Sequence, residues 1–474
     1  HPFWMRYTTG ADLEGRLKAM KVDLVADTGA FASYGLAVAM RAAVHAAGPY
    51  FVPNVHIDCR LAYTHNPWTG AMRGFGVPQV AFGHEGQMDA LADRLGLDPL
   101  EIRLLNALRP GMATATGHVL KSSVGLTLCL EKIRPFYNKW NKEIRGAGGG
   151  GRGVGVGAMF YGIGNTGVPN PSTAQIEWTP EGRIILYTGA ADIGQGSDTV
   201  LRQLAAARLG VADERLELVR ADTDRTTNAG ATSASRQTYI SGNAVLSAAA
   251  ALEDMLMAQA EEIMEANRSD LEMRAGEIRI KGSPASKITV EQVADRLVAR
   301  GVPPKAGGEF DPVTVRLDPD TGQGVPYATY AFAAQAALVE VDSCSGEVVV
   351  KQVAAAHDVG RAINRKSVEG QICGGVLMGQ GMALMEEYVP GGNENFDSYH
   401  IPTIMDMPEI EPIIVEAPEE TGPYGAKGVG EPSLIPTAPA IAGAVGRAVG
   451  RPMRNLPLNL ESVMEALTGE NHEN

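Results

Sequence analysis

The sequence of 474 residues has few of the side chains from which disulfide scaffolds and protein-ligated metal sites are built. Its four cysteines, Cys59, Cys129, Cys344 and Cys373, lie far apart and form no C-x-x-C pair. The nine histidines are equally scattered, with no H-x-x-x-H pair. This spacing excludes a disulfide scaffold, and it excludes an iron–sulfur cluster or structural zinc of the usual kind built by this chain alone. A metal used here must be carried by something other than cysteine or histidine side chains.

Long apolar runs and an excess of basic residues are also missing. No stretch of about twenty apolar residues occurs, so we expect no membrane span. The opening HPFWMRYTTG is neither basic nor followed by an apolar segment, so no signal peptide is legible and we expect a cytoplasmic protein. Lys and Arg total 41 against 55 Asp and Glu, a formal charge of −14, without a basic stripe. Nucleic acid is therefore not an expected partner.

The length and the periodicity predict two or three domains that mix strands and helices without regular βαβ alternation, which is an α+β class. A strand is expected at 21–31, and Asp98 is expected to cap a helix that starts at Pro99. Glycines at 147–157 interrupt the pattern and suggest a domain boundary. Thr289 and Gln292 predict a capping box. Further helices are expected at 36–47, 79–95, 99–108 and 239–267.

The second half contains two segments of similar order. A hairpin at 174–189 is followed by a glycine loop that enters a helix, and a hairpin at 336–360 is followed by glycine-rich chain that enters another. Both copies contain G-Q-G, at Gln195 and Gln380. An internal duplication explains this order, although two such units can also arise by chance.

Four polar, glycine-flanked segments stand out from the rest of the chain. They supply backbone N–H groups, hydroxyls, amides and an arginine where bulky side chains are absent, which suits a large phosphate-bearing ligand. None is a Walker loop, and no G-x-G-x-x-G follows a clear strand. Singly, each is equally typical of a turn. The segments are GAMRGFGVPQ (70–79), GAADIGQG (189–196), TTNAGATSASRQ (226–237) and GAKGVGEPS (425–433).

Together and in this order, these segments closely resemble the molybdenum-binding large subunit of the xanthine dehydrogenase and aldehyde oxidase family, the molybdenum hydroxylases. The resemblance runs from His1 to about Leu467 and rests on R-G-F-G-x-P-Q, G-Q-G, S-x-S-R-Q and G-V-G-E-P. It implies the α+β fold of that subunit, with 1–145 as the remainder of a first molybdopterin-binding domain and 146–474 as the second.

The resemblance also accounts for the missing metal ligands, because in this family a pterin carries the molybdenum. In bacteria the molybdopterin is often extended to a cytosine dinucleotide. Two of the implied residues have simpler explanations: Gln371 as a helix-surface amide and Gln195 as a helix-start residue. The implied cofactor-binding residues are Arg73, Gly194, Gln195, Gly196, Ser233, Ser235, Arg236, Gln237, Gln371, Lys427, Gly428, Val429 and Gly430.

Glu431 occupies the position of the family's catalytic base. A carboxylate in a water-poor pocket that can raise its pKa suits the removal of a proton from a water-derived oxygen. The alternative is that Pro432 opens a helix and Glu431 is only an anion near its positive end.

Three residues are implied at the substrate: Arg41, Phe75 and Ala234. Arg41 precedes Arg73 by 32 residues, the spacing expected for the pocket arginine of purine-hydroxylating members. A guanidinium there stabilises negative charge on a heteroaromatic ring. Arg41 can instead be a helix arginine that reaches solvent, and Arg73 a buried arginine that binds loop carbonyls. The stretch 158–161 offers further lining candidates, although core packing of Phe160 explains it equally well.

The resemblance leaves out the family's usual first half, including its G-G-F-G-G-K loop. We therefore expect a second molybdopterin-domain subunit, as in split members such as nicotinate dehydrogenase, or a missing N-terminal half. Iron–sulfur and FAD subunits are expected as separate chains. The leading hypothesis is hydroxylation of an N-heteroaromatic substrate, purine or nicotinate-like. The alternatives are an aldehyde oxidoreductase with the same site and a non-catalytic structural subunit.

Overall fold

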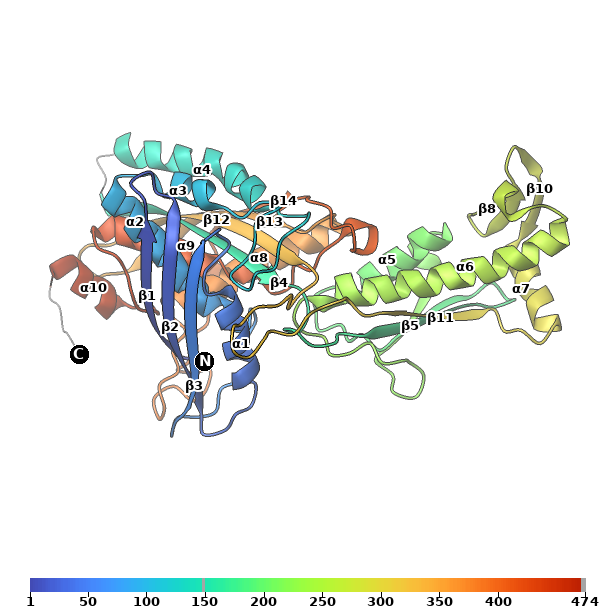
Figure 1. Cartoon of the computed structure of the whole chain (residues 1–474), viewed down its shortest axis with the longest axis horizontal. Coiled ribbons are helices and arrows are strands. Elements are labelled where there is room, and N and C mark those ends of the chain that lie inside the picture. Colours follow the sequence, from blue (N-terminus) through green and yellow to red (C-terminus); the bar gives the residue numbers. More distant parts are fainter. Residues whose placement is uncertain (147–149, 470–474) are drawn as a thin grey trace. The chain divides into compact units, whose positions relative to one another are not determined.

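The computed structural model describes residues 1–146 and 150–469, and these form two compact units (Figure 1). The first unit contains residues 1–162, 315–419 and the chain from 429 on. The second unit contains residues 163–314 and 420–428. The glycine-rich segment 425–433 is therefore divided, with Lys427 and Gly428 in the second unit and Val429, Gly430 and Glu431 in the first.

A three-stranded sheet begins the first unit, in the order β1-β2-β3. Strand β1 pairs antiparallel with β2, and β2 pairs parallel with β3, so the chain between β2 and β3 must cross over. Helix α1 lies in that crossover, and α2 packs against β1. The elements are β1 (Phe3–Ala11), β2 (Leu17–Gly29), α1 (Gly35–His45), β3 (Asn54–Tyr63), α2 (Val77–Leu95) and α3 (Pro99–Asn106).

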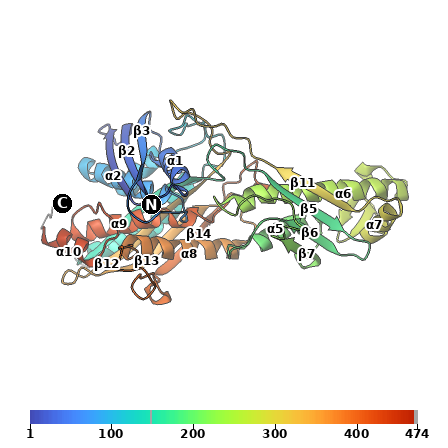
Figure 2. The ribbon, with the colours of Figure 1, turned by 90° about the horizontal axis from the view of Figure 1, so that it is seen from below.

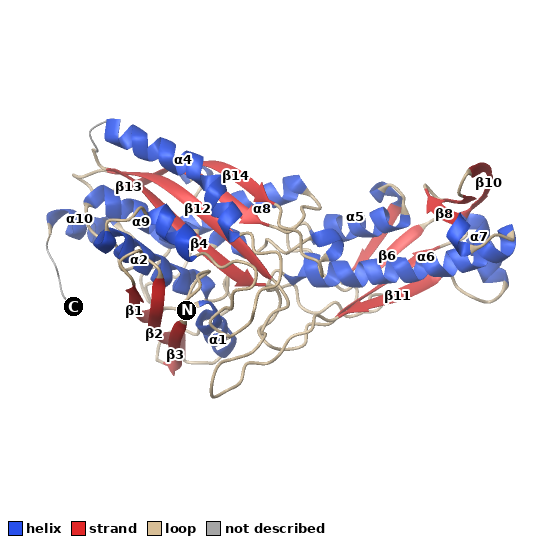
Figure 3. Ribbon diagram, turned by 45° about the horizontal axis from the view of Figure 1, so that its top comes forward, coloured by secondary structure: helices blue, strands red, loops and turns tan. Residues whose placement is uncertain are grey.

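A four-stranded sheet in the order β14-β13-β12-β4 forms the centre of the first unit (Figure 3). Side chains alternate between its faces, so Ala334, Ala336 and Ala356 pack in the cluster that contains α4, while Ala337, Val339 and Val353 pack with α8 and α9. The elements are α4 (Leu126–Gly146), β4 (Arg152–Gly162), β12 (Tyr330–Val341), β13 (Val348–Asp358), α8 (Arg365–Leu384), β14 (Glu409–Val415), α9 (Thr437–Val449) and α10 (Leu460–Thr468).

The glycine run at 147–157, which was interpreted from the sequence as a break in periodicity, is partly strand β4. Gly153, Gly155 and Gly157 all face α9, and a Cβ on each would lie 2.0–2.2 Å from a carbonyl oxygen of that helix or of the residue before it. The intervening Val154 and Val156 fill the opposite face. The run is therefore a strand with period two, whose missing side chains let a helix lie directly on the sheet. Residues 147–149 of the run lie outside the described residues.

The second unit also has a four-stranded sheet, in the order β11-β5-β6-β7 (Figure 2). Helix α6 packs along β11 and β5, and Gly308 on β11 would place a Cβ 2.1 Å from the backbone nitrogen of Ala248 on that helix. A separate sheet joins β8, β9 and β10. The elements are β5 (Ser172–Trp178), β6 (Ile184–Thr188), α5 (Ser197–Leu209), β7 (Leu216–Arg220), α6 (Gly242–Met264), β8 (Leu271–Arg274), β9 (Glu277–Ile280), β10 (Ser283–Thr289), α7 (Val290–Ala299) and β11 (Lys305–Phe310).

The two large sheets share one strand arrangement, although the outer strand β4 precedes its hairpin in the chain and the outer strand β11 follows its own. Each has a hairpin, β5–β6 or β12–β13, whose second strand continues through a helix to a parallel third strand. Each adds an outer antiparallel strand, β11 or β4, that carries glycine against a helix. The shared hairpin, helix and parallel strand are what an internal duplication predicts, and the duplication itself stays a prediction.

Local capping predictions are confirmed. Asp98 accepts hydrogen bonds from the backbone of Leu100 and Glu101, and Thr289 forms the capping box with Gln292. In the described part of the chain no helix is long and apolar enough to cross a membrane. The division into cofactor-binding domains at residue 146 stays a prediction, because the compact units follow spatial contacts and interleave along the chain.

Candidate functional site

Glu431 lies in the first unit, half-buried between Gly430 and Pro432. Pro432 opens only a single 3₁₀ turn, η6 (Pro432–Leu434), before α9. The Glu431 side chain makes no capping hydrogen bond to that turn. The helix-end explanation therefore has no capping contact to support it.

Arg73 holds the segment that carries Glu431. Its Nε donates to the Gly430 carbonyl at 2.6 Å, and one terminal nitrogen donates to Ser433 Oγ at 2.6 Å. The same nitrogen donates to Gln371 Oε1 at 3.1 Å and to the Gln371 carbonyl at 3.3 Å. Burial lowers the pKa of Arg73, and the nearby charge of Glu431 acts in the opposite direction. Arg73 thus binds loop carbonyls and also joins Gln371, Gly430 and the Glu431 segment into one cluster.

Helix α8 uses its glycines on two faces. Gly375 and Gly379 pack against the segment after Glu431, since a Cβ on either would meet Ser433 or Thr437 within about 2.5 Å. Gly370 and Gly374 have nothing within 4 Å of such a Cβ and flank Gln371 on an open face. The Gln371 amide nitrogen has no hydrogen-bond partner among the described residues. This face can receive a flat polar group at close range.

Arg41 is buried, with 2% of its surface exposed. A terminal nitrogen donates to the Gly162 carbonyl at 3.1 Å, and the guanidinium carbon lies 4.7 Å from the Tyr161 ring centre and 5.9 Å from that of Phe75. Tyr327 contributes a third ring at 5.1 Å. The alternative in which Arg41 reaches solvent is wrong, because aromatic faces hold its charge inside the unit.

Of the other lining candidates, Phe160 is a core residue, packed between Tyr330 and Phe332 on the α4 face. Ala158 is fully buried, and its backbone nitrogen donates to Glu85. Tyr161 packs under Arg41, and its buried hydroxyl has no partner among the described residues.

His45 fixes the backbone beside Arg41. Its Nε2 accepts from the Gly162 nitrogen at 3.0 Å, so the ring proton is on Nδ1 and is donated to the Arg41 carbonyl at 2.7 Å. Complete burial, helped by the charge of Arg41, lowers the pKa of His45 to about 3. The imidazole is therefore neutral at physiological pH.

Acid should destabilise the first unit through His45. The pKa of His45 is lower in the folded state than in the unfolded state. Its contribution to the free energy of unfolding is therefore complete above about pH 6.5, and it is lost at about 1.4 kcal/mol per pH unit as the pH falls toward 3. Urea unfolding at several pH values gives the free energy of unfolding as a function of pH. In His45→Gln the slope of this function in the acid range should be smaller by the equivalent of one proton bound on unfolding. His56→Gln, an exposed histidine changed in the same way, is the control. An unchanged slope in His45→Gln would contradict the assignment.

In the second unit, Gly194, Gln195 and Gly196 form the loop before α5. The Gln195 side chain folds back onto this loop, with Oε1 accepting from Ile193 at 2.7 Å and Nε2 donating to Ser197 at 2.9 Å. Asp192 accepts from the nitrogens of Gly194 and Asp198. The loop therefore holds its shape by itself, and Gly194, at φ +100° with open space around it, is its approachable point.

Arg236 organises the 226–237 loop from inside. Its terminal nitrogens donate to the carbonyls of Ala229 at 2.6 Å and of Asn170 and Pro171 at 2.7 Å each, and burial lowers its pKa. Direct phosphate contact would require those bonds to break, so the geometry favours a supporting role.

Neighbouring residues tie this loop to two other glycine segments of the second unit. Gln237 donates to Thr232, whose hydroxyl donates to the Ala191 carbonyl. A Cβ on Gly428 would lie 1.9 Å from the Ser235 carbonyl oxygen, so the two backbones touch. Ala234 and Ser235 both have positive φ, +53° and +54°. Ser233 is exposed and Lys427 is buried. Strained backbone of this kind gathers at ligand sites.

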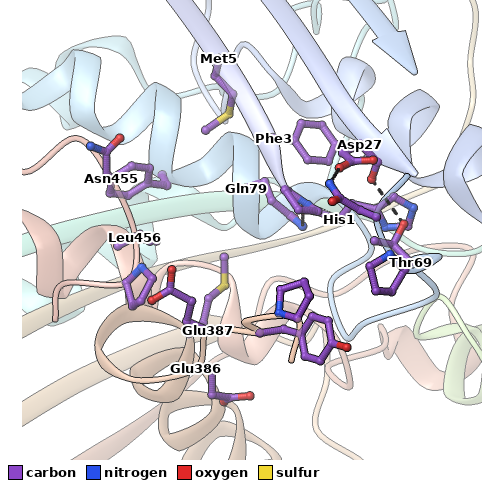
Figure 4. Close-up of a pocket in the computed structure, with 18 of the residues that line it drawn as sticks. His1, Phe3, Met5, Asp27, Thr69, Gln79, Glu386, Glu387, Asn455 and Leu456 are labelled. Atoms are coloured by element: carbon purple, nitrogen blue, oxygen red, sulfur yellow. Dashed lines mark hydrogen bonds between the residues drawn. The ribbon is translucent and has the colours of Figure 1, made fainter. Parts of the chain in front are cut away.

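The first unit also has a cavity of about 810 Å³ that is not lined by Arg73, Gln371 or Glu431 (Figure 4). His1, Trp68, Gln79 and Glu386 are among its lining residues, and none of the residues predicted for cofactor or substrate lines it. Asp27, one of the carboxylates that line it, accepts hydrogen bonds from Thr64 and Asn66. This cavity does not contribute to the Arg73 cluster.

Some residues of these clusters were not predicted from the sequence. Ser433 and Asp192 shape the two loops, and Gln335 and His357 lie behind Ser433. Asp192 had a local signal, since aspartate two residues before a glycine commonly accepts from that glycine's nitrogen. Ser433 lies inside the segment 425–433 but had no signal of its own, and Gln335 and His357 come from strands β12 and β13, far from that segment in the sequence, and had none.

Comparison with known proteins decides the family. Models described as molybdopterin cofactor-binding domains match residues 1–107 and 130–408. The chain belongs to the molybdenum hydroxylase family. A putative xanthine dehydrogenase molybdenum-binding subunit of Escherichia coli is 33% identical over 98% of this chain and 62% of its own length.

Two further relatives of this molybdenum hydroxylase chain are informative. The aldehyde oxidoreductase from Desulfovibrio desulfuricans has a TM-score of 0.88 at 31% identity, covering 98% of this chain and 49% of that one. The nicotinate dehydrogenase large molybdopterin subunit of Eubacterium barkeri is 58% identical over 134 residues, 28% of this chain and 32% of its own. The chain thus spans 62% of the Escherichia coli subunit and 49% of the aldehyde oxidoreductase, although almost all of the chain itself is matched. The α+β fold expected from the resemblance is confirmed.

The residues present fit a molybdopterin. Gln371 in the first unit, flanked by open glycines of α8, offers an amide to a flat heterocycle. Within residues 1–146 and 150–469, no group of three His, Cys, Asp or Glu side chains is arranged to hold a metal.

Proposed function

We propose that this chain is the molybdenum-cofactor subunit of a hydroxylase that inserts a water-derived oxygen into an N-heteroaromatic substrate, purine or nicotinate-like. The observation that carries the proposal is the Arg73 cluster, which fixes the segment of Glu431 beside Gln371 and its open glycine face. The names of two relatives, a xanthine dehydrogenase subunit and a nicotinate dehydrogenase subunit, support this substrate class.

The balanced reaction is R–H + H₂O → R–OH + 2 H⁺ + 2 e⁻. When bound, the molybdenum–pterin group supplies the two-electron oxidation. Glu431 accepts a proton from the attacking water-derived oxygen, and Arg73 holds its segment in place. Arg41 supplies positive charge near the ring, with Phe75 as an aromatic wall. Ala234 is proposed at the substrate and the remaining predicted residues at the pterin, with Arg236 acting through loop shape.

Cofactor form, partners and location are part of the same proposal. We place the pterin as a cytosine dinucleotide, with residues 1–145 and 146–474 contributing to two cofactor-binding domains. A further molybdopterin-domain region, an iron–sulfur subunit and an FAD subunit complete the enzyme, since the electrons must leave through other groups. The cysteines Cys59, Cys129, Cys344 and Cys373 are all free thiols, which fits a cytoplasmic location.

Aldehyde oxidation is the second candidate function, favoured by the 0.88 TM-score to an aldehyde oxidoreductase. The buried Arg41 favours a heterocyclic substrate, because the negative charge that develops on an aldehyde oxygen lies too far from the guanidinium to be stabilised by it. A purely structural subunit is disfavoured by the Glu431 segment, which several long-range hydrogen bonds hold in place.

Isotope labelling tests the proposal. The purified complex that contains this chain should convert purine or nicotinate to a hydroxylated product, and in H₂¹⁸O the new oxygen should carry the label. Assays with small aldehydes on the same preparation give the competing activity. Label from O₂ instead of water, or turnover of aldehydes alone, would contradict the proposal.

A further inference from the structure

The segment that follows Glu431 also rests on buried polar contacts made by Gln335, His357 and Thr437, none of which is a predicted site residue. Gln335 on β12 and His357 on β13 lie on the sheet face that packs against α8 and α9. Their side chains, with Ser433 and Thr437, are all at most 1% exposed. A polar group buried this deeply costs free energy unless it is paired, so its bonds constrain the structure.

Each atom of the Gln335 amide has a partner. Its Nε2 donates to the Ser433 carbonyl at 3.0 Å and lies 3.1 Å from His357 Nε2, while its Oε1 accepts from the Thr437 hydroxyl at 2.7 Å. The Ser433 carbonyl can only accept, so the amide group that faces it must be the NH₂. His357 Nε2 must then accept the second N–H, which places the ring proton on Nδ1.

This arrangement requires a neutral His357, and its surroundings provide that. Burial, together with the charge of Arg73, lowers the pKa of His357 to about 3. A protonated ring would present an N–H to the Gln335 amide nitrogen and break the network. Arg73 therefore supports the Glu431 segment directly at Gly430, and its charge also helps to keep His357 neutral.

From these contacts we infer that Gln335 and His357 are positioning residues for Glu431. Gly430 is held by Arg73 on one side of the carboxylate, and Ser433 is held by Gln335 on the other. His357 orients the Gln335 amide so that its NH₂ faces Ser433. The inference rests on the proposed role of Glu431 as the base, and it extends that site to two strands of the central sheet.

The test uses the holoenzyme complex with Gln335→Met, which keeps length but removes both amide hydrogens. We expect kcat to fall roughly 10- to 100-fold, because small displacements of a catalytic group have effects of this order, with KM and molybdenum content close to wild type. Tyr50→Phe is the control, since it removes another buried hydrogen bond, to Glu85 at 2.6 Å, in the same unit. Its kcat should stay near wild type.

A second pair of variants keeps the inference testable if Gln335→Met does not assemble. His357→Gln can still accept from Gln335 and should retain most activity, whereas His357→Leu cannot and should lose about tenfold in kcat. Equal kcat in the two variants, or an unchanged kcat in Gln335→Met, would overturn the inference. If these variants are unaffected while Glu431→Gln is impaired, only the positioning role of Gln335 and His357 is wrong. If Glu431→Gln is fully active, the proposed role of Glu431 as the base is itself wrong.

Discussion

Glu431→Gln is expected to lower kcat by about 10²-fold or more, while molybdenum and pterin content stay near wild type. A factor of 10² corresponds to about 2.7 kcal/mol of transition-state stabilisation, within the range for loss of a general base. The variant should fold, because the bonds from Arg73 to the Gly430 carbonyl and Ser433 Oγ, and from Gln335 to the Ser433 carbonyl, remain when Glu431 becomes Gln. Steady-state kinetics normalised to bound molybdenum would measure the loss.

The control for this variant is Glu420→Gln, which makes the same change at an exposed carboxylate earlier in the chain. It should leave kcat and molybdenum content unchanged. A fully metallated Glu431→Gln enzyme with near-normal turnover would falsify the assignment of the base. Loss of molybdenum along with activity would instead indicate that Glu431 serves to retain the cofactor.

Local features of the fold could be predicted from the sequence because their causes are local. Asp98 before Pro99 and the Thr289–Gln292 pair determine helix starts through contacts within three residues. The alternation in G-V-G-V-G was misread as a break, since its cause is a helix nearly three hundred residues later that packs on β4. A pattern whose reason is tertiary cannot be separated from a loop by composition alone.

The candidate site shows the same limit. Motif resemblance identified Arg73, Gln371 and Glu431, and the structure brings these three together through direct bonds and charge. The resemblance could not show that the Gln195 side chain binds its own loop, or that the Arg236 guanidinium donates to main-chain carbonyls. Residue type limits what a side chain can bind, whereas the partner it binds depends on packing.

Arg41 gives the second large expected effect and separates heterocycle from aldehyde chemistry. Attack on an aromatic ring drives negative charge into the ring, where a fixed guanidinium stabilises it mainly in the transition state, so its loss lowers kcat together with kcat/KM. Arg41→Met should therefore reduce heteroaromatic turnover by about 10²-fold, or about 2.7 kcal/mol, and spare activity on small aldehydes. Both activities are measured on one preparation with matched molybdenum content.

Packing around Arg41 sets how this result must be interpreted. Met also loses the bond to the Gly162 carbonyl and the stacking on Tyr161 and Tyr327, and such structural damage affects both substrate classes alike. The informative quantity is thus the ratio of the two activities. Arg41→Lys keeps the charge without the planar fork and should fall between wild type and Arg41→Met on heterocycles. Equal losses on both substrates would assign Arg41 a structural role, and full heteroaromatic activity in Arg41→Met would favour the aldehyde alternative.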